Sequence, residues 1–306
     1  MADRSKTGQQ APSPTPAALS VFDRDTAVQR VDEQNTDGKH AAEVRFTAEV
    51  SSDWRAGRGP HGGYLAAILL RALIETVADP ARSPRSLTIH YARAPKPGPV
   101  SIRTVLEREG RSLSTLSARM EQDGAVVALV LAAFSVPWSA PELSDLPMPE
   151  VEPAETSREA GTLRAYGAPP FTNHIVLQPR MGAFPFTGSE LPMEIGGWLG
   201  LAEPRPIDAL SLAFFSDALF SPPFIRLTQP ATSPTIDLTI HFRAALTHVT
   251  NPDRSEIGQH ELCLARFSTG LIHEGFFEED GVIWSADGTV LAQSRQLAIV
   301  MALHGG

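Results

Sequence analysis

The fold of this chain is decided by two short stretches of nearly the same sequence, Leu87-Thr88-Ile89-His90-Tyr91 and Leu238-Thr239-Ile240-His241-Phe242. Each alternates side chains and is rich in β-branched residues, which predicts a β-strand. Because the two copies lie in opposite halves of a chain of 306 residues, they indicate an internal repeat of two units.

A long helical stretch precedes each copy. The first runs from Tyr64 to Val77 and is apolar nearly all round, as expected of a helix that other structure surrounds. The second is predicted over Ile207–Phe220, where Asp217-Ala218-Leu219 aligns with Arg71-Ala72-Leu73.

Strand signals surround each helix. Asp123-Gly124 and Asp287-Gly288 each separate two strand-like runs and predict tight turns. The run at 42–50 opens the first half and is matched by a weaker run at 171–179. These patterns predict an α+β fold with two repeats, each an antiparallel sheet wrapped around a long central helix, which is the double hotdog architecture.

The chain also shows where the units end. The stretch from Pro137 to Glu159 contains five prolines, many acids and no apolar period, which is typical of a linker. We therefore predict an N-terminal hotdog at 21–137, a linker at 138–160 and a C-terminal hotdog at 161–306. Residues 1–20 are rich in Pro, Ser, Thr and Gln, and we expect them to form a disordered leader.

Composition excludes several classes of function. A net charge of −9 argues against a nucleic-acid partner, which would need a cationic surface. No stretch approaches the ~20 apolar residues that span a bilayer. Cys263 is the single cysteine, so neither a disulfide within the chain nor a cysteine-rich metal site is expected. We expect a cytoplasmic protein with Cys263 in its core and no bound metal.

A glycine-rich segment precedes the first helix. Gly57-Arg-Gly59-Pro-His-Gly62 has the spacing of a dinucleotide-binding loop. The preceding strand alternates, however, and the next strand carries no terminal acid for a ribose, so we reject that interpretation. Gly62 and Gly63 are instead expected to let the chain turn into the helix, where amides bind anions or polarise a carbonyl. His61 is a candidate for substrate contact or a structural residue at the helix start.

The repeat supplies an internal control. Aligning the two Asp-Gly turns places the apolar residues 129–132 of the first half opposite the polar residues 293–296 of the second. At these positions the first copy therefore has the composition of a structural core, and the second copy carries polar groups suited to catalysis.

Several segments together resemble the TesB-like (type II) acyl-CoA thioesterase family. They are HGGYLAAILLRAL, RSLTIHYARAPKPGPV, EREGRSLSTLSARMEQDG and DGTVLAQSRQLAIV. The resemblance covers about 40–136 and 170–301 and implies a double hotdog that hydrolyses acyl-CoA to fatty acid and CoA without a cofactor.

The resemblance also implies the catalytic residues. The family's Asp, Thr or Ser, and Gln, which hold and activate a water molecule, fall on Asp217, Thr235 and Gln296. Asp208 and Thr239 are the nearest alternatives. The glycine-rich helix start makes Gly62, Gly63 and Tyr64 the expected substrate-binding residues.

The residues themselves support these assignments unequally. Asp217 lies among apolar residues, where burial would raise its pKa toward that of a general base, although an exposed acid near a helix end would look similar. Strand alternation places Thr235 on one face with Asp237, Thr239 and His241, as any solvated strand threonine would be. Gln296 shares its face with Ser294 and Ala298.

Other interpretations remain open at this level. Asp217 could attack the thioester itself and form an anhydride. A hotdog hydratase would need a histidine paired with an acid at the central helix, and a non-catalytic acyl-CoA-binding protein would need no such group. Candidate cations for the CoA phosphates are Arg82, Arg85, Arg93 and Lys96. Since hotdog units commonly pair edge to edge, we expect the chain to form a homodimer.

Overall fold

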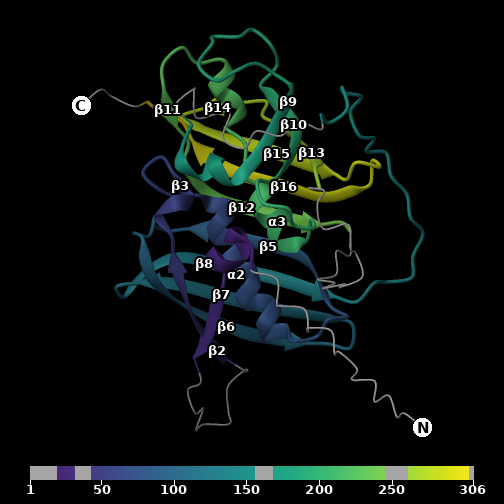
Figure 1. Cartoon of the computed structure of the whole chain (residues 1–306). Coiled ribbons are helices and arrows are strands. Elements are labelled where there is room, and N and C mark those ends of the chain that lie inside the picture. The colour runs from purple at the N-terminus through teal and green to yellow at the C-terminus, as the bar shows by residue number, and fades with distance from the viewer. Residues whose placement is uncertain (1–18, 32–42, 156–167, 245–260, 303–306) are drawn as a thin grey trace, which may run out of the picture.

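A computed structural model describes residues 19–31, 43–155, 168–244 and 261–302. The leader expected at 1–20 lies almost wholly outside these ranges, as does part of the linker. One 13-stranded sheet runs through both halves in the order β1-β2-β6-β7-β8-β5-β12-β16-β15-β13-β10-β9, with β14 paired to β15 (Figure 1). The double hotdog α+β fold predicted from the repeat is confirmed.

The strands of the first half are β1 (Val28–Val31), β2 (Glu43–Val50), β5 (Ser83–Tyr91), β6 (Gly98–Glu109), β7 (Leu113–Gln122) and β8 (Ala125–Ser135). Those of the second half are β9 (Ile175–Met181), β10 (Glu194–Leu201), β12 (Thr235–Phe242), β13 (Cys263–Ser268), β14 (Ile272–His273), β15 (Phe276–Trp284) and β16 (Val290–Ile299). Two small ribbons pair β3 (Arg55–Ala56) with β4 (Gly59–Pro60), and β11 (Ala231–Thr232) with β17 (Met301–Ala302).

The two copies of the repeated motif form the junction between the halves. β5 and β12 pair antiparallel with Thr88 opposite Thr239, and the two hydroxyl oxygens lie 3.1 Å apart in a hydrogen bond. On either side, Leu87 faces Ile240 and Ile89 faces Leu238. The stretch that marks each unit in the sequence therefore also joins the units edge to edge.

The strand order corrects one part of the alignment between the halves. Counting outward from the junction, β2 corresponds to β10 and β1 corresponds to β9. The match of 42–50 with 171–179 was therefore wrong, because β10 is the true counterpart of β2. β10 has no alternating pattern since nearly all of its residues are buried. A Cβ on its Gly197 would lie only 2.2 Å from the Gln178 carbonyl oxygen.

The two helices inside the sheet differ in length. α2 (Gly62–Val77) has 16 residues, ten of them buried, as predicted. α3 (Ala209–Phe215) has seven residues, so the helix predicted over Ile207–Phe220 was too long. After Phe215 the α-helical hydrogen-bond pattern gives way to a tighter, 3₁₀-type turn. The N–H groups of Asp217 and Ala218 there donate to carbonyls three residues back. A short helical turn, η4 (Pro222–Ile225), follows.

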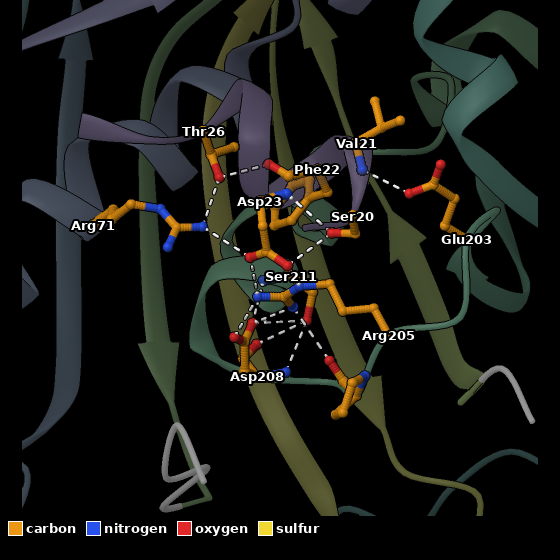
Figure 2. A network of polar contacts seen from close by, with 11 residues as sticks. Ser20, Val21, Phe22, Asp23, Thr26, Arg71, Glu203, Arg205, Asp208 and Ser211 are labelled. Carbon is orange, nitrogen blue, oxygen red and sulfur yellow. Dashed lines mark hydrogen bonds and ion pairs between the residues drawn. The ribbon is translucent and has the colours of Figure 1, made fainter. Parts of the chain in front are cut away.

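A polar network ties the N-terminal helix α1 (Val21–Asp25) to both central helices (Figure 2). Asp23 accepts hydrogen bonds from Arg71 of α2 and from Arg205, which also binds Asp208 at the start of α3. Burial alone would raise the pKa of Asp23, but the bonds and charge of Arg205, helped by Ser20 and Arg71, lower it below its ordinary value. The network holds the start of α3 against α2.

The connections match the predicted turns only in part. Asp123 and Gly124 both have positive φ, which forms the two-residue turn expected between β7 and β8. Gly288 lies in a longer connection, where its N–H donates to the Ser285 carbonyl.

The predicted linker forms neither helix nor strand at 136–155. It lies along the second half, because Trp198 and Trp284 donate to the carbonyls of Glu152 and Leu146. Two further elements, η1 (Ser52–Trp54) and η3 (Pro170–His174), pack against each other.

The structure also bears on two predictions from composition, the burial of Cys263 and the lack of a membrane-spanning segment. Cys263 is fully buried in the core, where burial raises the pKa of its thiol to about 12. In the described ranges, no helix is both long enough and apolar enough to cross a bilayer.

Candidate active site

The Asp217 carboxylate lies at the amino end of α2, on the other half of the molecule. Its Oδ2 accepts a hydrogen bond of 2.9 Å from the Gly63 N–H. A Cβ on Gly62 would lie 2.8 Å from the same oxygen, and a Cβ on Gly63 would lie 2.4 Å from the Phe214 carbonyl. The two glycines therefore allow α2 and the turn after α3 to approach closely, and the carboxylate sits where the helix dipole favours negative charge.

His61 fixes the backbone of Asp217. Its ring is almost fully buried and caps α2, because Nδ1 accepts a bond of 3.3 Å from the Tyr64 N–H. Its Nε2 is 2.7 Å from the Asp217 carbonyl oxygen and donates to it, and it lies 3.6 Å from Oδ2. Burial lowers the pKa of His61 despite the nearby carboxylate, so the ring stays neutral with its proton on Nε2.

Thr235 and Gln296 lie together on the inner face of the sheet. The Thr235 hydroxyl donates a bond of 2.8 Å to Gln296 Oε1. Thr235 was predicted to share a face with Asp237, Thr239 and His241, and this was wrong. A β-bulge between Thr235 and Asp237 shifts the register of β12 against β16, and the extra residue turns Thr235 inward.

Gln296 occupies the face predicted for it. It is buried with Ser294 and Ala298 and lies directly opposite Leu238 of β12. Its side chain therefore points into the interior of the second unit.

Glu279 of β15 is a fourth polar residue at this place, and the sequence analysis missed it. It is directly opposite Gln296, whose Nε2 donates a bond of 2.6 Å to Glu279 Oε1. Burial raises the pKa of Glu279 to about 8; the charges of Asp217 and Asp280 raise it further, and the Gln296 bond opposes them. Strand alternation with buried Phe277 was the signal that could have placed Glu279 inside.

The four side chains thus form two groups. Thr235, Gln296 and Glu279 are joined by hydrogen bonds, whereas Asp217 is close enough for its charge to act on Glu279. Among the described residues, the Asp217 carboxylate bonds to Gly63 rather than to Thr235 or Gln296. Its Oδ1 has no protein donor there, and the side chain is 16% exposed.

The two alternative candidates have structural positions. Asp208 caps α3 through a reciprocal pair of bonds with Ser211 and is bound by Arg205. Thr239 bonds to Thr88 at the junction of the halves.

Tyr64 and Tyr91 lie on either side of the helix start. Tyr64 is fully buried, stacks on Trp54 and donates from its hydroxyl to the Asp25 carbonyl, so we do not include its side chain in the proposed site. The Tyr91 hydroxyl donates 2.9 Å to the Gly62 carbonyl. Burial, and then the charge of Asp217, raise its pKa well above the usual value, so it stays protonated beside the carboxylate.

The candidate phosphate-binding cations differ in their surroundings. Arg82 donates to Asp79, Ser114 and the Gly110 carbonyl, which fixes the β6–β7 turn. Arg85 reaches the Ser135 carbonyl at 3.4 Å. Arg93 and Lys96 are exposed in the segment between β5 and β6, which leaves them as the better candidates.

Comparisons with known proteins agree with this architecture. Residues 50–135 match the family described as acyl-CoA thioesterase N-terminal domain, and residues 143–300 match its C-terminal domain. An uncharacterized protein of Mycobacterium tuberculosis (strain ATCC 25618 / H37Rv) is 25% identical over 281 residues, which cover 84% of this chain and 91% of that protein.

Two solved structures are similar along most of the chain. A hotdog-fold protein of unknown function from Alicyclobacillus acidocaldarius has a TM-score of 0.75 and 25% identity, covering 94% of this chain and 100% of that one. The acyl-CoA thioesterase II TesB2 from Mycobacterium marinum has a TM-score of 0.68 and 17% identity, covering 93% and 100%. At 17% identity the likeness shows a shared fold.

The two family matches together cover most of the sequence, in the order that the two halves require. The chain therefore belongs to the acyl-CoA thioesterase family, as its resemblance to the TesB-like enzymes predicted.

Proposed function

We propose that this protein hydrolyses acyl-CoA thioesters to a free fatty acid and CoA, with Asp217, Thr235 and Gln296 activating the water. One observation carries the proposal. The Asp217 carboxylate is held at the amino end of α2 by Gly63, its Oδ1 has no donor among the residues that the structure describes, and the side chain is partly exposed. A carboxylate in that position can accept a proton from water.

The hydrogen bonds of Thr235 and Gln296 support one arrangement of the water. The Thr235 proton points to Gln296, so the Thr235 oxygen is left to accept from water. Gln296 Nε2 uses one N–H toward Glu279 and keeps the other for the water oxygen. The remaining water O–H would donate to Asp217.

The reaction then balances without a cofactor. The water oxygen forms a bond to the thioester carbonyl carbon while Asp217 takes the proton. Collapse of the tetrahedral intermediate breaks the C–S bond, and Asp217 returns the proton to the CoA thiolate. The products are a carboxylic acid and a thiol, and the carboxylate is regenerated.

The start of α2 would stabilise the oxyanion. The N–H groups of Gly63 and Tyr64 are occupied by Asp217 and His61. In the part of the chain that the structure describes, the Gly62 N–H has no protein acceptor, as expected at the first position of a helix. An amide aimed at developing negative charge lowers the barrier by a few kcal/mol, typically ~3.

A hydratase is the less favoured alternative, although His61 and Asp217 form the histidine–acid pair that such an enzyme would need. Both ring nitrogens of His61 are bound to backbone groups, and the ring is 3% exposed. Such a histidine holds structure and does not exchange protons with a substrate.

The test compares wild type with Asp217→Asn for release of free CoA from acyl-CoA substrates of graded chain length. The amide keeps the acceptor for Gly63 but not the base, so kcat should fall by about 10³-fold. Asp237→Asn is the control, because Asp237 lies on the outer face next to the bulge. Undiminished turnover in Asp217→Asn contradicts the proposal and favours a non-catalytic acyl-CoA-binding protein.

A single turnover in ¹⁸O-labelled water tests for an Asp217 nucleophile whose anhydride is opened at the Asp217 carbonyl. If Asp217 acts as a base, the label enters only the fatty acid. If Asp217 forms an anhydride that water opens at the Asp217 carbonyl, the label enters its side chain.

The proposed setting is fatty acid metabolism in the cytoplasm, with the chain acting as a homodimer. The lone, buried Cys263 suits a reducing compartment. Fractionation of cells tests the cytoplasmic location, and light scattering of the purified chain tests the homodimer.

A further inference from the structure

Glu279 is a buried acid that the proposed reaction does not use. Its side chain is 5% exposed, lies on the inner face of β15 and contacts Gln296 of the neighbouring strand. The first half has Leu116 at the equivalent position, opposite Ala132. An acid here therefore replaces an apolar residue on the same backbone, directly behind a proposed catalytic side chain.

Gln296 can hold water correctly in only one of its two amide orientations. With Oε1 toward Thr235 and Nε2 toward Glu279, it accepts from a hydroxyl and donates to a carboxyl oxygen. Rotating the amide by 180° would place its NH₂ against the Thr235 proton and its oxygen against the Glu279 oxygen. With its proton on Oε2, a neutral Glu279 presents only an acceptor, Oε1, to Gln296, and this makes the rotation unfavourable.

We propose that Glu279 is a positioning residue that holds the Gln296 amide in one orientation, through the hydrogen bond that Gln296 Nε2 donates to Glu279 Oε1. This inference rests on the proposed function, since Gln296 acts there on the water. The role assigned to Glu279 is exerted through Gln296.

The groups around Glu279 favour the neutral form. Burial is the largest influence and, with the charges of Asp217 and Asp280, raises the pKa of Glu279 to about 8. Arg295, the cation next to Gln296 on β16, is bound to Asp280. His61, beside Asp217, is held neutral by burial.

The neutral form also suits the reaction. Hydrolysis of a thioester develops negative charge on the carbonyl oxygen, and a second carboxylate near Asp217 would oppose it. We therefore expect kcat of the wild type to decline as the pH rises above about 8, the pKa of Glu279, because its ionisation then adds that charge.

Two substitutions separate the acceptor from the ionisation. Glu279→Gln keeps an oxygen for Gln296 and cannot ionise, so kcat should stay within about threefold of wild type and the alkaline decline should disappear. Glu279→Leu copies the first half and removes the acceptor, so kcat should fall by about 10- to 50-fold with KM unchanged.

A second measurement does not depend on turnover. The side-chain NH₂ resonances of Gln296, assigned by their absence in Gln296→Ala, should shift with a midpoint near pH 8 in wild type. In Glu279→Gln these resonances should not shift over the same pH range. This readout applies even if the wild type releases no CoA, an outcome that would contradict only the proposed function, or if Glu279→Leu fails to fold.

Three results would overturn the inference. They are a Gln296 NH₂ signal that does not respond to Glu279, a Glu279→Leu enzyme within twofold of wild type in kcat, and a Glu279→Gln enzyme as slow as Glu279→Leu.

Discussion

The two halves of the molecule carry different side chains on the same backbone. In the first half, Leu116, Ala132 and Leu87 lie side by side on β7, β8 and β5. In the second half, Glu279, Gln296 and Leu238 occupy the corresponding places on β15, β16 and β12. A packed apolar row in one unit has thus become a hydrogen-bonded polar row in the other.

The two halves also share the β-bulge that places Thr235. β5 carries a bulge between Pro84 and Ser86, just as β12 carries one between Thr235 and Asp237. Pro84 therefore marks the position that Thr235 takes in the second half. The bulge belongs to the fold, and only the residue placed on it differs.

The comparison also divides the polar run 293–296 into two parts. Ser294 and Gln296 point inward, whereas Arg295 points outward. In the first half the same alternation leaves Leu129 and Leu131 exposed, at 43% and 60%. The difference between the halves at the inward-facing positions therefore concerns the site. The difference at the outward-facing positions concerns the surface.

The largest expected effect comes from moving the acid into the apolar unit. Leu116→Glu buries a carboxyl without a partner and should lower the free energy of unfolding by about 4 kcal/mol. Leu129→Glu, on the exposed face of β8, is the control and should change it by less than ~0.5 kcal/mol. Urea unfolding measures both changes. Equal losses of stability in the two variants would show that the inner face of the first unit tolerates a carboxyl group as well as its exposed face does.

The second effect concerns pH. Burial raises the pKa of Glu279 in the folded chain to about 8, whereas an unperturbed glutamate, as in the unfolded chain, has a pKa of 4.5. Between these values the folded state binds more protons, so stability is lost as pH rises. Glu279→Gln removes this loss.

We therefore expect Glu279→Gln to gain in unfolding free energy over wild type by about 3 kcal/mol between pH 5 and pH 8. Denaturant unfolding of both proteins across that range measures the gain. A constant difference would contradict the buried, protonated acid.

The third effect concerns activity. Gln296→Ala copies Ala132 of the first half and removes the group proposed to hold water, so kcat should fall by about 100-fold, or about 2.7 kcal/mol. Gln293→Ala, nearer the start of β16, should retain full turnover. Release of CoA measures both, and an active Gln296→Ala would remove Gln296 from the mechanism.

The smallest effect is expected on the outer face. Leu131→Arg copies Arg295 and should change stability by less than ~0.5 kcal/mol and leave kcat unchanged, because Leu131 is exposed. A large loss of stability would show that this face is covered by a partner, and light scattering of the variant would then report dissociation.

The site could be predicted only in part. The repeat and the family resemblance selected Asp217, Thr235 and Gln296, and the structure joins two of these by a hydrogen bond. Helical periodicity overextended α3 through Phe220, because Ala218, Leu219 and Phe220 continue the apolar pattern although turn contacts end the helix at Phe215. Alternation placed Thr235 on the wrong face because a bulge leaves no local signal. Glu279 was missed because two further acidic neighbours make its strand read as a solvated surface.

The sequence by itself determined the two units, the central helix of the first unit and the turn at Asp123-Gly124. These depend on periodicity and turn chemistry within a few residues. Only the tertiary structure decided that the repeated strands pair with each other and that Asp217 meets Gly63, 154 residues away in the chain. Contacts over such separations arise from packing and strand register, which no local pattern encodes.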